Sequence, residues 1–176
     1  MLPPTPHARL LLLTPRPALE ASYRDYIAEL GDEERYPFPL DYPHDDFPAL
    51  LRRLADLERG IGVPEGAEAS STYWLVDGDE LVGVSNLRHA LNDRLRERGG
   101  HIGLGIRPSR RGQGLGTTLL RLTLARARSR GIVQAHVHCH AHNAASAGMI
   151  RACGGVLDSE AGDGAGRIQR FIVPAG

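Results

Sequence analysis

The stretch IRPSRRGQGLGTTLL, Ile106 to Leu120, decides the fold. An apolar strand stops at Pro108, a turn rich in arginine and glycine follows, and a long amphipathic helix begins near Gly114. Glycine lets backbone N–H groups approach a ligand without obstruction from a Cβ, and the turn has glycines at 112, 114 and 116. Amides at a helix start are unpaired and lie at the positive end of its dipole. The stretch therefore predicts a site for phosphate oxygens.

Other phosphate-binding loops match this stretch poorly. It has no G-K-[ST] sequence, so it is not a Walker-type nucleotide loop. Its spacing, G-x-G-x-G, is not the G-x-G-x-x-G of dinucleotide-binding folds, and no acidic residue follows at the expected distance. Arg110 and Arg111 add positive charge, which suits a diphosphate cradle. A glycine-rich turn that merely joins a strand to a helix is the alternative.

The composition indicates one globular domain spanning residues 1–176. Hydrophobic residues make up 41% of the 176 residues, and the formal net charge is zero. This balance argues against a protein that binds nucleic acid or a membrane surface by charge. Two cysteines are too few for a disulfide framework, and the four-leucine run Leu10 to Leu13 is too short for a signal peptide or membrane span. We therefore expect a cytoplasmic protein with reduced thiols.

Hydrophobic periodicity and turn residues predict a mixed α/β domain without repeats or linkers. Proline-rich residues 31–45 indicate an irregular loop, and residues 90–99 a polar connection with a helical turn. The expected strands span residues 9–14, 72–76, 81–88, 101–107, 132–140, 156–159 and 167–173, and the expected helices residues 18–30, 47–58, 114–130 and 144–153.

Arg111 to Gly116, RGQGLG, matches the R/Q-x-x-G-x-G/A signature of the GCN5-related N-acetyltransferase (GNAT) family, and the chain resembles that family. The order of neighbouring elements agrees as well. A hairpin precedes the motif strand, and Asn143 to Ser146 fits the family's N-x-x-[AS] helix, which leads to the glycine turn at Gly154. The resemblance covers roughly residues 70–160, whereas residues 9–60 match only in element order. Within the family, the chain is similar to a little-characterised bacterial branch.

The resemblance implies the acyl-CoA N-acyltransferase fold, of the α/β (α+β) class. This fold is a single mixed, mostly antiparallel sheet of about seven strands, flanked by four helices and with splayed central strands. Acetyl-CoA, as co-substrate, would insert between those strands. Asn143 could instead simply cap its helix. The residues that the resemblance assigns to the cofactor are Leu104, Ile106, Arg107, Arg111, Gly112, Gln113, Gly114, Leu115, Gly116, Thr117, Asn143 and Ser146.

The implied reaction is direct transfer of an acetyl group to a primary amine, on a small molecule or a protein N-terminus, in a ternary complex. It needs a base, a donor for the developing oxyanion and a proton for the departing thiolate. Many family members supply that proton from a tyrosine seven residues after the asparagine, but here this position is Ile150. Ser146, water or departure of CoA as thiolate are the alternatives.

Several residues are candidates for the base. His101 lies near the start of the motif strand, and Glu33 and Glu34 lie in a loop that faces the acceptor in many relatives. His89, at the end of a hairpin strand, is a weaker candidate. Alternation along the strand groups His101 with the two glycines at 103 and 105. The resemblance suggests that the opposite set faces the substrate, namely Ile102, Leu104 and Ile106.

The histidine-rich strand HVHCHAHN, His136 to Asn143, allows three interpretations. Alternation places small apolar residues on one face, which should pack on a helix, and the histidines on the other. Two histidines in His-x-His spacing can bind zinc, but no third ligand is marked and the family requires no metal. The histidines could instead line the acceptor site, or have no catalytic role. The residues expected on the packed face are Val133, Ala135, Val137, Cys139 and Ala141.

A non-catalytic acyl-CoA-binding or sensing module is the second functional hypothesis. It would keep the cradle while lacking a competent acid and base, as Ile150 suggests. A histidine-based metalloprotein is a third, which the glycine motif does not predict. Homodimers are common among relatives, so a homodimer is possible. The acceptor itself is set by segments with little signal, which are residues 31–43, 90–100 and 158–167.

Overall fold

A computed structural model describes residues 10–176, and its centre is a seven-stranded sheet in the order β1-β2-β3-β4-β5-β7-β6. All neighbouring strands are antiparallel except β4 and β5, which are parallel. The mixed, mostly antiparallel sheet is therefore confirmed. Arg9, predicted to begin the first strand, lies outside the described residues. The strands are β1 (Leu10–Leu13), β2 (Ser70–Asp77), β3 (Glu80–Arg88), β4 (Ile102–Ile106), β5 (Gln134–His140), β6 (Val156–Ala161) and β7 (Ile168–Pro174).

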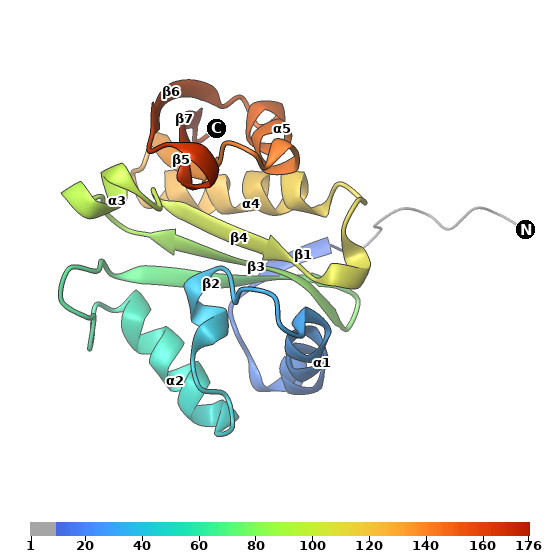
Figure 1. The fold of residues 1–176 in the computed structure, drawn as a ribbon. Coiled ribbons are helices and arrows are strands. Elements are labelled where there is room, and N and C mark those ends of the chain that lie inside the picture. The colour runs from blue at the N-terminus through green and yellow to red at the C-terminus, as the bar shows by residue number, and fades with distance from the viewer. Residues whose placement is uncertain (1–9) are drawn as a thin grey trace, which may run out of the picture.

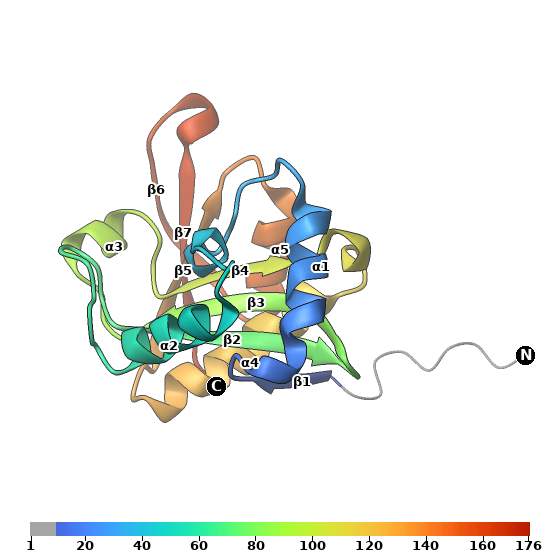
Figure 2. The same cartoon turned by 90° about the horizontal axis from the view of Figure 1, so that it is seen from below.

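Helices cover both faces of the sheet. In Figures 1 and 2, α1 and α2 lie on one face and α4 and α5 on the other. The four predicted helices are present, and the helical turn expected in the polar connection is the short α3. Among residues 10–176, no helix has the length and apolar character that crossing a membrane would require. The helices are α1 (Glu20–Leu30), α2 (Phe47–Glu58), α3 (Asp93–Glu97), α4 (Leu115–Ser129) and α5 (Ala144–Ala152).

Alternation along β2 divides the apolar side chains between two cores. Trp74 packs under α1 and α2, where its ring stacks on Tyr23 with centroids 5.4 Å apart. The neighbouring Tyr73 and Leu75 point to the opposite face, under α4 and α5, where Leu119 is fully buried. The two cores hold the sheet between the helix layers and fix the positions of the strand ends.

The central strands separate soon after they meet. β4 and β5 share a single paired position, Ile102 with Val137. The His101 N–H donates to the His136 carbonyl at 2.7 Å just before this pair. Beyond it, Leu104 to Ile106 has no ladder partner in β5. This is the predicted splay, and it opens a gap in the middle of the sheet.

Two expectations about individual side chains were wrong. Val133 precedes β5 and is 65% exposed, whereas Ala135 and Val137 are buried as predicted. Ile102 was expected to face the substrate, but it is 1% exposed and belongs to the core under α4. Both differences arise at strand ends, where alternation says which side a residue faces but not what covers it.

Candidate functional site

A cavity of about 920 Å³ occupies the gap between β4 and β5. It extends from the glycine-rich loop before α4 to residues 98–99, which follow α3, and the loop after α1 also contributes to its wall. Arg107 and Gln113 are outside its lining. The predicted cofactor residues that line it are Leu104, Ile106, Arg111, Gly112, Gly114, Leu115, Gly116, Thr117, Asn143 and Ser146.

The glycine-rich loop forms an open cradle at the start of α4. Gly112 and Gly114 have φ values of 74° and 75°, a left-handed conformation that side chains rarely adopt, and no atom lies within 4 Å of a Cβ built on either. Gly114 is the N-cap of α4, which has no side-chain cap. The first amides of α4 are thus free to bind an anion. The cradle fits the diphosphate of a coenzyme.

The two arginines of the loop act differently. Arg110 pairs with Asp77 at 2.6 Å and with Glu80, so it fastens the loop to the β2–β3 hairpin. Arg111 pairs with Glu33 across the cavity at 2.8 Å, and its Nε donates to the Ile106 carbonyl at 3.1 Å. The Arg111 side chain therefore crosses the space beside the β4 backbone.

The free edge of β4 is formed by Leu104 and Ile106. The Arg107 N–H donates to the Val82 carbonyl at 2.9 Å, and the Arg88 N–H to the His101 carbonyl at 2.7 Å. Because antiparallel partners alternate, the odd-numbered residues of β4 bond to β3, and the backbone groups of Leu104 and Ile106 point toward β5. These groups can pair with an extended chain that enters the gap.

Arg107 was predicted to contact the cofactor, but its side chain lies elsewhere. It is 9% exposed and forms an ion pair with Glu29 of α1 at 2.7 Å. The hydrogen bond from Arg107 lowers the pKa of Glu29 to about 2. The backbone N–H of Arg107 bonds to β3 and its side chain anchors the end of β4 to α1. Neither the N–H nor the guanidinium of Arg107 is therefore available to the cavity.

Asn143 and Ser146 lie together where β5 leads into α5. The Asn143 side-chain oxygen accepts the Ser146 N–H at 3.0 Å, so Asn143 caps α5. This is the alternative raised from the sequence, and it leaves the Asn143 amide NH₂ group available to the cavity. Ile150, at the position of the family's tyrosine, is fully buried in the core. No acid can act from that position.

The two histidine candidates for the base lie outside the cavity lining. His101 is 7% exposed, and its Nδ1 accepts the His136 N–H at 2.9 Å. Burial, reinforced by the charges of His136 and nearby arginines, lowers the pKa of His101 to about 4. His89 bonds to the Ser71 hydroxyl at 2.8 Å. These contacts hold both rings in structural positions.

The acidic candidates, Glu33 and Glu34, both line the cavity. Glu33 is engaged by Arg111, and that hydrogen bond lowers the pKa of Glu33. Glu34 has no ion-pair partner among residues 10–176. Of the predicted bases, Glu34 is therefore the one placed at the cavity with its carboxylate uncommitted.

Tyr36 and Arg98 also line the cavity and were not predicted from the sequence. Tyr36 is 41% exposed as a residue, but its hydroxyl lies against β4, 2.7 Å from where a Cβ on Gly103 would stand. Burial raises the pKa of Tyr36, and the Arg88 guanidinium beside it opposes this effect. No sequence signal marked either residue, because each is brought to the cavity by an irregular segment.

The histidine strand contributes His138, Cys139 and His140 to the cavity lining. Cys139 was expected to pack toward a helix. Besides lining the cavity, it does pack against the core under α5. Among the described residues, no group of three or more histidine, cysteine, aspartate or glutamate side chains is arranged to hold a metal ion. Both ring nitrogens of His138 are buried without a hydrogen-bond partner.

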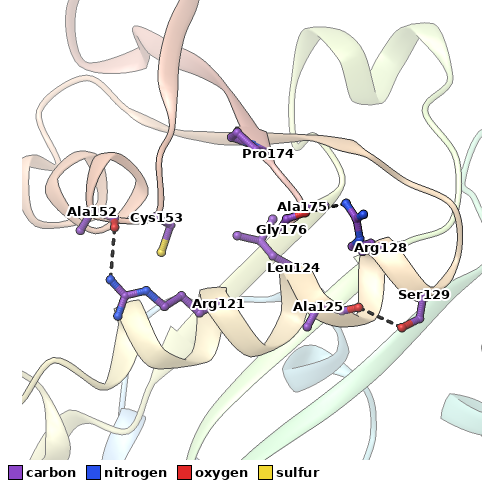
Figure 3. Close-up of a pocket in the computed structure, with 10 residues that line it drawn as sticks. All are labelled: Arg121, Leu124, Ala125, Arg128, Ser129, Ala152, Cys153, Pro174, Ala175 and Gly176. Atoms are coloured by element: carbon purple, nitrogen blue, oxygen red, sulfur yellow. Dashed lines mark hydrogen bonds between the residues drawn. The ribbon is translucent and has the colours of Figure 1, made fainter.

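A second hollow, of about 680 Å³, lies between α4, the end of α5 and the C-terminal residues. Figure 3 shows it with Arg121 bonded to the Ala152 carbonyl and Arg128 turned toward Gly176. Its charged groups are thus tied to backbone carbonyls. It lies far along α4 from the cradle and brings no candidate residue together.

An open mixed sheet, split between two parallel strands and with a glycine cradle at the mouth of the split, defines the class of acyl-CoA N-acyltransferase folds. The sequence profile of the Acetyltransferase (GNAT) family matches residues 25–154. The chain belongs to this family. No curated protein sequence matches the chain.

Solved structures with the same fold include three acetyltransferases. RimJ from Mycobacterium smegmatis, in complex with a CoA disulfide, has a TM-score of 0.70 and 18% identity over 97% of this chain and 84% of its own. The ribosomal-protein-S5-alanine acetyltransferase from Vibrio fischeri has a TM-score of 0.69 and 12% identity over 94% and 93%. A chimera of the spermidine N-acetyltransferase SpeG from Vibrio cholerae and hSSAT has a TM-score of 0.62 and 16% identity over 96% of both chains.

Proposed function

We propose that this protein transfers the acetyl group of acetyl-CoA directly to a primary amine in a ternary complex. The observation that carries the proposal is the single cavity that joins the glycine cradle to the loop bearing Glu34. The cradle has the features of a coenzyme site, and Glu34 supplies an unpaired carboxylate suited to an ammonium group. The similar structures include enzymes named for spermidine and for a ribosomal protein alanine, which are amine acceptors.

The cradle would hold the diphosphate through the backbone amides of Arg111 to Gly116 and Thr117. The free edge of β4 at Leu104 and Ile106 would pair with the pantetheine arm, and Asn143 would contact the same arm from the β5 side. In this structure the Arg111 side chain donates a hydrogen bond to the Ile106 carbonyl, which the arm would need. Its side chain must swing aside or turn to the phosphates when the arm enters.

The chemistry would be carried out at the point where the strands part. Glu34 would take a proton from the acceptor amine, directly or through water. A backbone N–H of β4 would stabilise the developing oxyanion. Ser146 would donate to the departing sulfur, since the tyrosine position is a core isoleucine. Direct transfer requires no covalent intermediate on the protein.

A non-catalytic acyl-CoA-binding module is the second candidate. The burial of Ile150 favours it, because the family's common acid is absent. The two functions differ in turnover. Release of CoA from acetyl-CoA that depends on an added amine supports the enzyme, whereas acetyl-CoA binding without turnover of any amine in a broad panel supports the module.

The cofactor site is tested by changing Gly114 to glutamate. Gly131, at the other end of α4, provides a matched control, since it also has a left-handed φ of 84° and no atom within 4 Å of its Cβ position. Both substitutions strain the backbone equally, but only Gly114→Glu places bulk and negative charge in the cradle. We expect calorimetry to show no acetyl-CoA binding by Gly114→Glu and ordinary binding by Gly131→Glu. Undiminished binding by folded Gly114→Glu would refute the cofactor assignment.

A further inference from the structure

Within the described part of the chain, two arginines without carboxylate partners, Arg98 and Arg88, lie at the end of the cavity farthest from the cradle. Arg98 lines the cavity there. Arg88, behind it, is 8% exposed, and its NH1 donates to the carbonyls of Gly99 and Gly100 at 3.1 and 3.4 Å. Its guanidinium also lies over the Phe38 ring, 5.7 Å from the centroid. These contacts satisfy hydrogen bonds, but they supply no negative charge to balance a buried cation.

Several arginines elsewhere in the molecule have a carboxylate partner. Arg107, Arg110 and Arg130 each join two elements and pair with carboxylates at 2.6 to 2.9 Å. Within residues 10–176, neither Arg88 nor Arg98 has a carboxylate within ion-pair distance. Positive charge without a carboxylate partner is therefore present at this end of the cavity.

The ring of His138 is buried near this positive charge, which favours its neutral form. Its ring lies against Gly100, with Cδ2 3.3 Å from where a Cβ would stand, and neither ring nitrogen has a hydrogen-bond partner. Burial, reinforced by the charges of His136, Arg170 and Arg88, lowers the pKa of His138 to about 4. A neutral imidazole with a free N–H lines the same cavity as Arg98, with Arg88 behind the lining, and these groups together could accept an anion.

We propose that the acceptor carries a carboxylate beside its amine, and that Arg98, Arg88 and His138 select it. This inference rests on the proposed acetyl transfer and narrows its substrate to amino-acid-like amines. An arginine can bind both carboxylate oxygens in a forked geometry. Glu34, at the loop on the same cavity, is placed to hold the ammonium group. The two ends of a zwitterion would thus meet groups of opposite charge, whereas a polyamine would bring further positive charge to the arginines.

The test compares amino acids with their own α-carboxamides, and both with spermidine, by the rate of CoA release. The carboxamide retains the α-amine and has a larger share of it unprotonated, so simple reactivity favours the amide. We expect kcat/KM to be higher for the amino acid, by about tenfold or more, since charged hydrogen bonds to a carboxylate are lost in the amide. Equal or better use of the carboxamide or spermidine overturns the inference while leaving acetyl transfer intact.

Arg98→Gln tests the residue that lines the cavity, and Arg94→Gln on α3 is its control. Arg94 points toward Gly66, away from the cavity. Arg98→Gln should lower kcat/KM for the amino acid by about tenfold and leave the carboxamide unchanged. Arg94→Gln should change neither. A loss that is the same for both members of the pair would show that Arg98 does not read the carboxylate.

A second measurement needs no turnover. Acetate is titrated into the CoA-saturated protein while the histidine ring signals are followed by NMR. A carboxylate bound beside Arg98 and His138 adds negative charge, so the pKa of His138 should rise, and Arg98→Gln should abolish the rise. A His138 ring whose titration ignores acetate overturns the site, even if every amine in the panel fails. Failure of all amines together with a positive acetate response would instead count against acetyl transfer.

Discussion

His101 illustrates how a residue with catalytic chemistry can serve the fold. Its sequence position, near the start of the motif strand, made it a candidate base. The ring of His101 instead accepts a hydrogen bond from the His136 backbone N–H, and the backbone N–H of His101 donates to the His136 carbonyl. His101 therefore ties the start of β4 to β5 both as acceptor and as donor. Only a neutral ring can accept that bond. The contact therefore couples the junction of the central strands to pH.

This coupling gives a pH prediction with a definite sign. The pKa of His101 falls from 6.5 to about 4 on folding, so between these values the unfolded chain binds a proton that the folded chain does not. The free energy of unfolding therefore decreases as the pH falls from about 6.5 toward about 4, by up to about 3 kcal/mol. His101→Asn keeps an acceptor for the His136 N–H but cannot titrate.

Urea unfolding across this pH range measures the effect. The stability of His101→Asn should fall less steeply with acid than that of the wild type, and part of the slope should remain because the pKa of His138 is also about 4. His142, which is exposed, supplies a control through His142→Asn. A slope in His101→Asn identical to that of the wild type would mean that His101 does not bury a neutral ring.

At the scale of elements, β4 depends on two glycines for its fit under the loop after α1. A Cβ on Gly105 would lie 2.5 Å from the Tyr36 carbonyl oxygen, a backbone atom that cannot rotate away. Gly103 stands similarly against the Tyr36 hydroxyl. The absence of side chains at these positions lets the loop close over the strand. The loop in turn forms part of the cavity wall and holds Glu34 there.

Gly105→Ala should therefore destabilise the protein, by about 1 to 3 kcal/mol, because the backbone of the loop must move. Gly148→Ala in α5 is the contrasting change, since no atom lies within 4 Å of its Cβ position. Alanine there should stabilise the helix by up to about 1 kcal/mol. Chemical denaturation of both variants gives the comparison. A Gly105→Ala protein as stable as the wild type would show that the loop does not press on β4.

Elements with local signals were predictable from the sequence. The helix at residues 47–58 has an aspartate cap and a regular apolar stripe, and its bounds agree with α2. The motif strand, its proline stop and α4 were likewise expected, because each is encoded within a few residues. The approach of Tyr36 to β4 was not predictable, since it depends on a proline-rich loop with no periodicity. The same holds for Arg98, which reaches the cavity only through the fold of residues 90–100.

At the scale of the whole molecule, the sheet consists of two parts that meet at a short junction. β1 to β4 form one ladder and β5 to β7 another. Ile102 pairs with Val137 between β4 and β5, and an isolated bridge joins Gly100 to Val137 beside it. On one face, α4 packs over β1, β3 and β4 and α5 over β5, and contact between these two helices holds the parts together. A ligand that pairs with the free edge of β4 and contacts β5 would complete the sheet through its middle.

Acetyl-CoA should therefore protect the β4 edge from hydrogen exchange. The N–H groups of Leu104 and Ile106 point into the gap, whereas those of Gly103 and Gly105 already bond to β3, and this alternation supplies an internal control. Saturating acetyl-CoA should slow exchange at Leu104 or Ile106 much more than at Gly103 and Gly105, and should raise the melting temperature in proportion to the logarithm of its concentration. Exchange measured residue by residue by NMR tests this. A ligand that lies between the strands protects the N–H groups that face β5 more than those that face β3. Equal slowing at all four positions would therefore indicate general stabilisation by a ligand bound outside the gap.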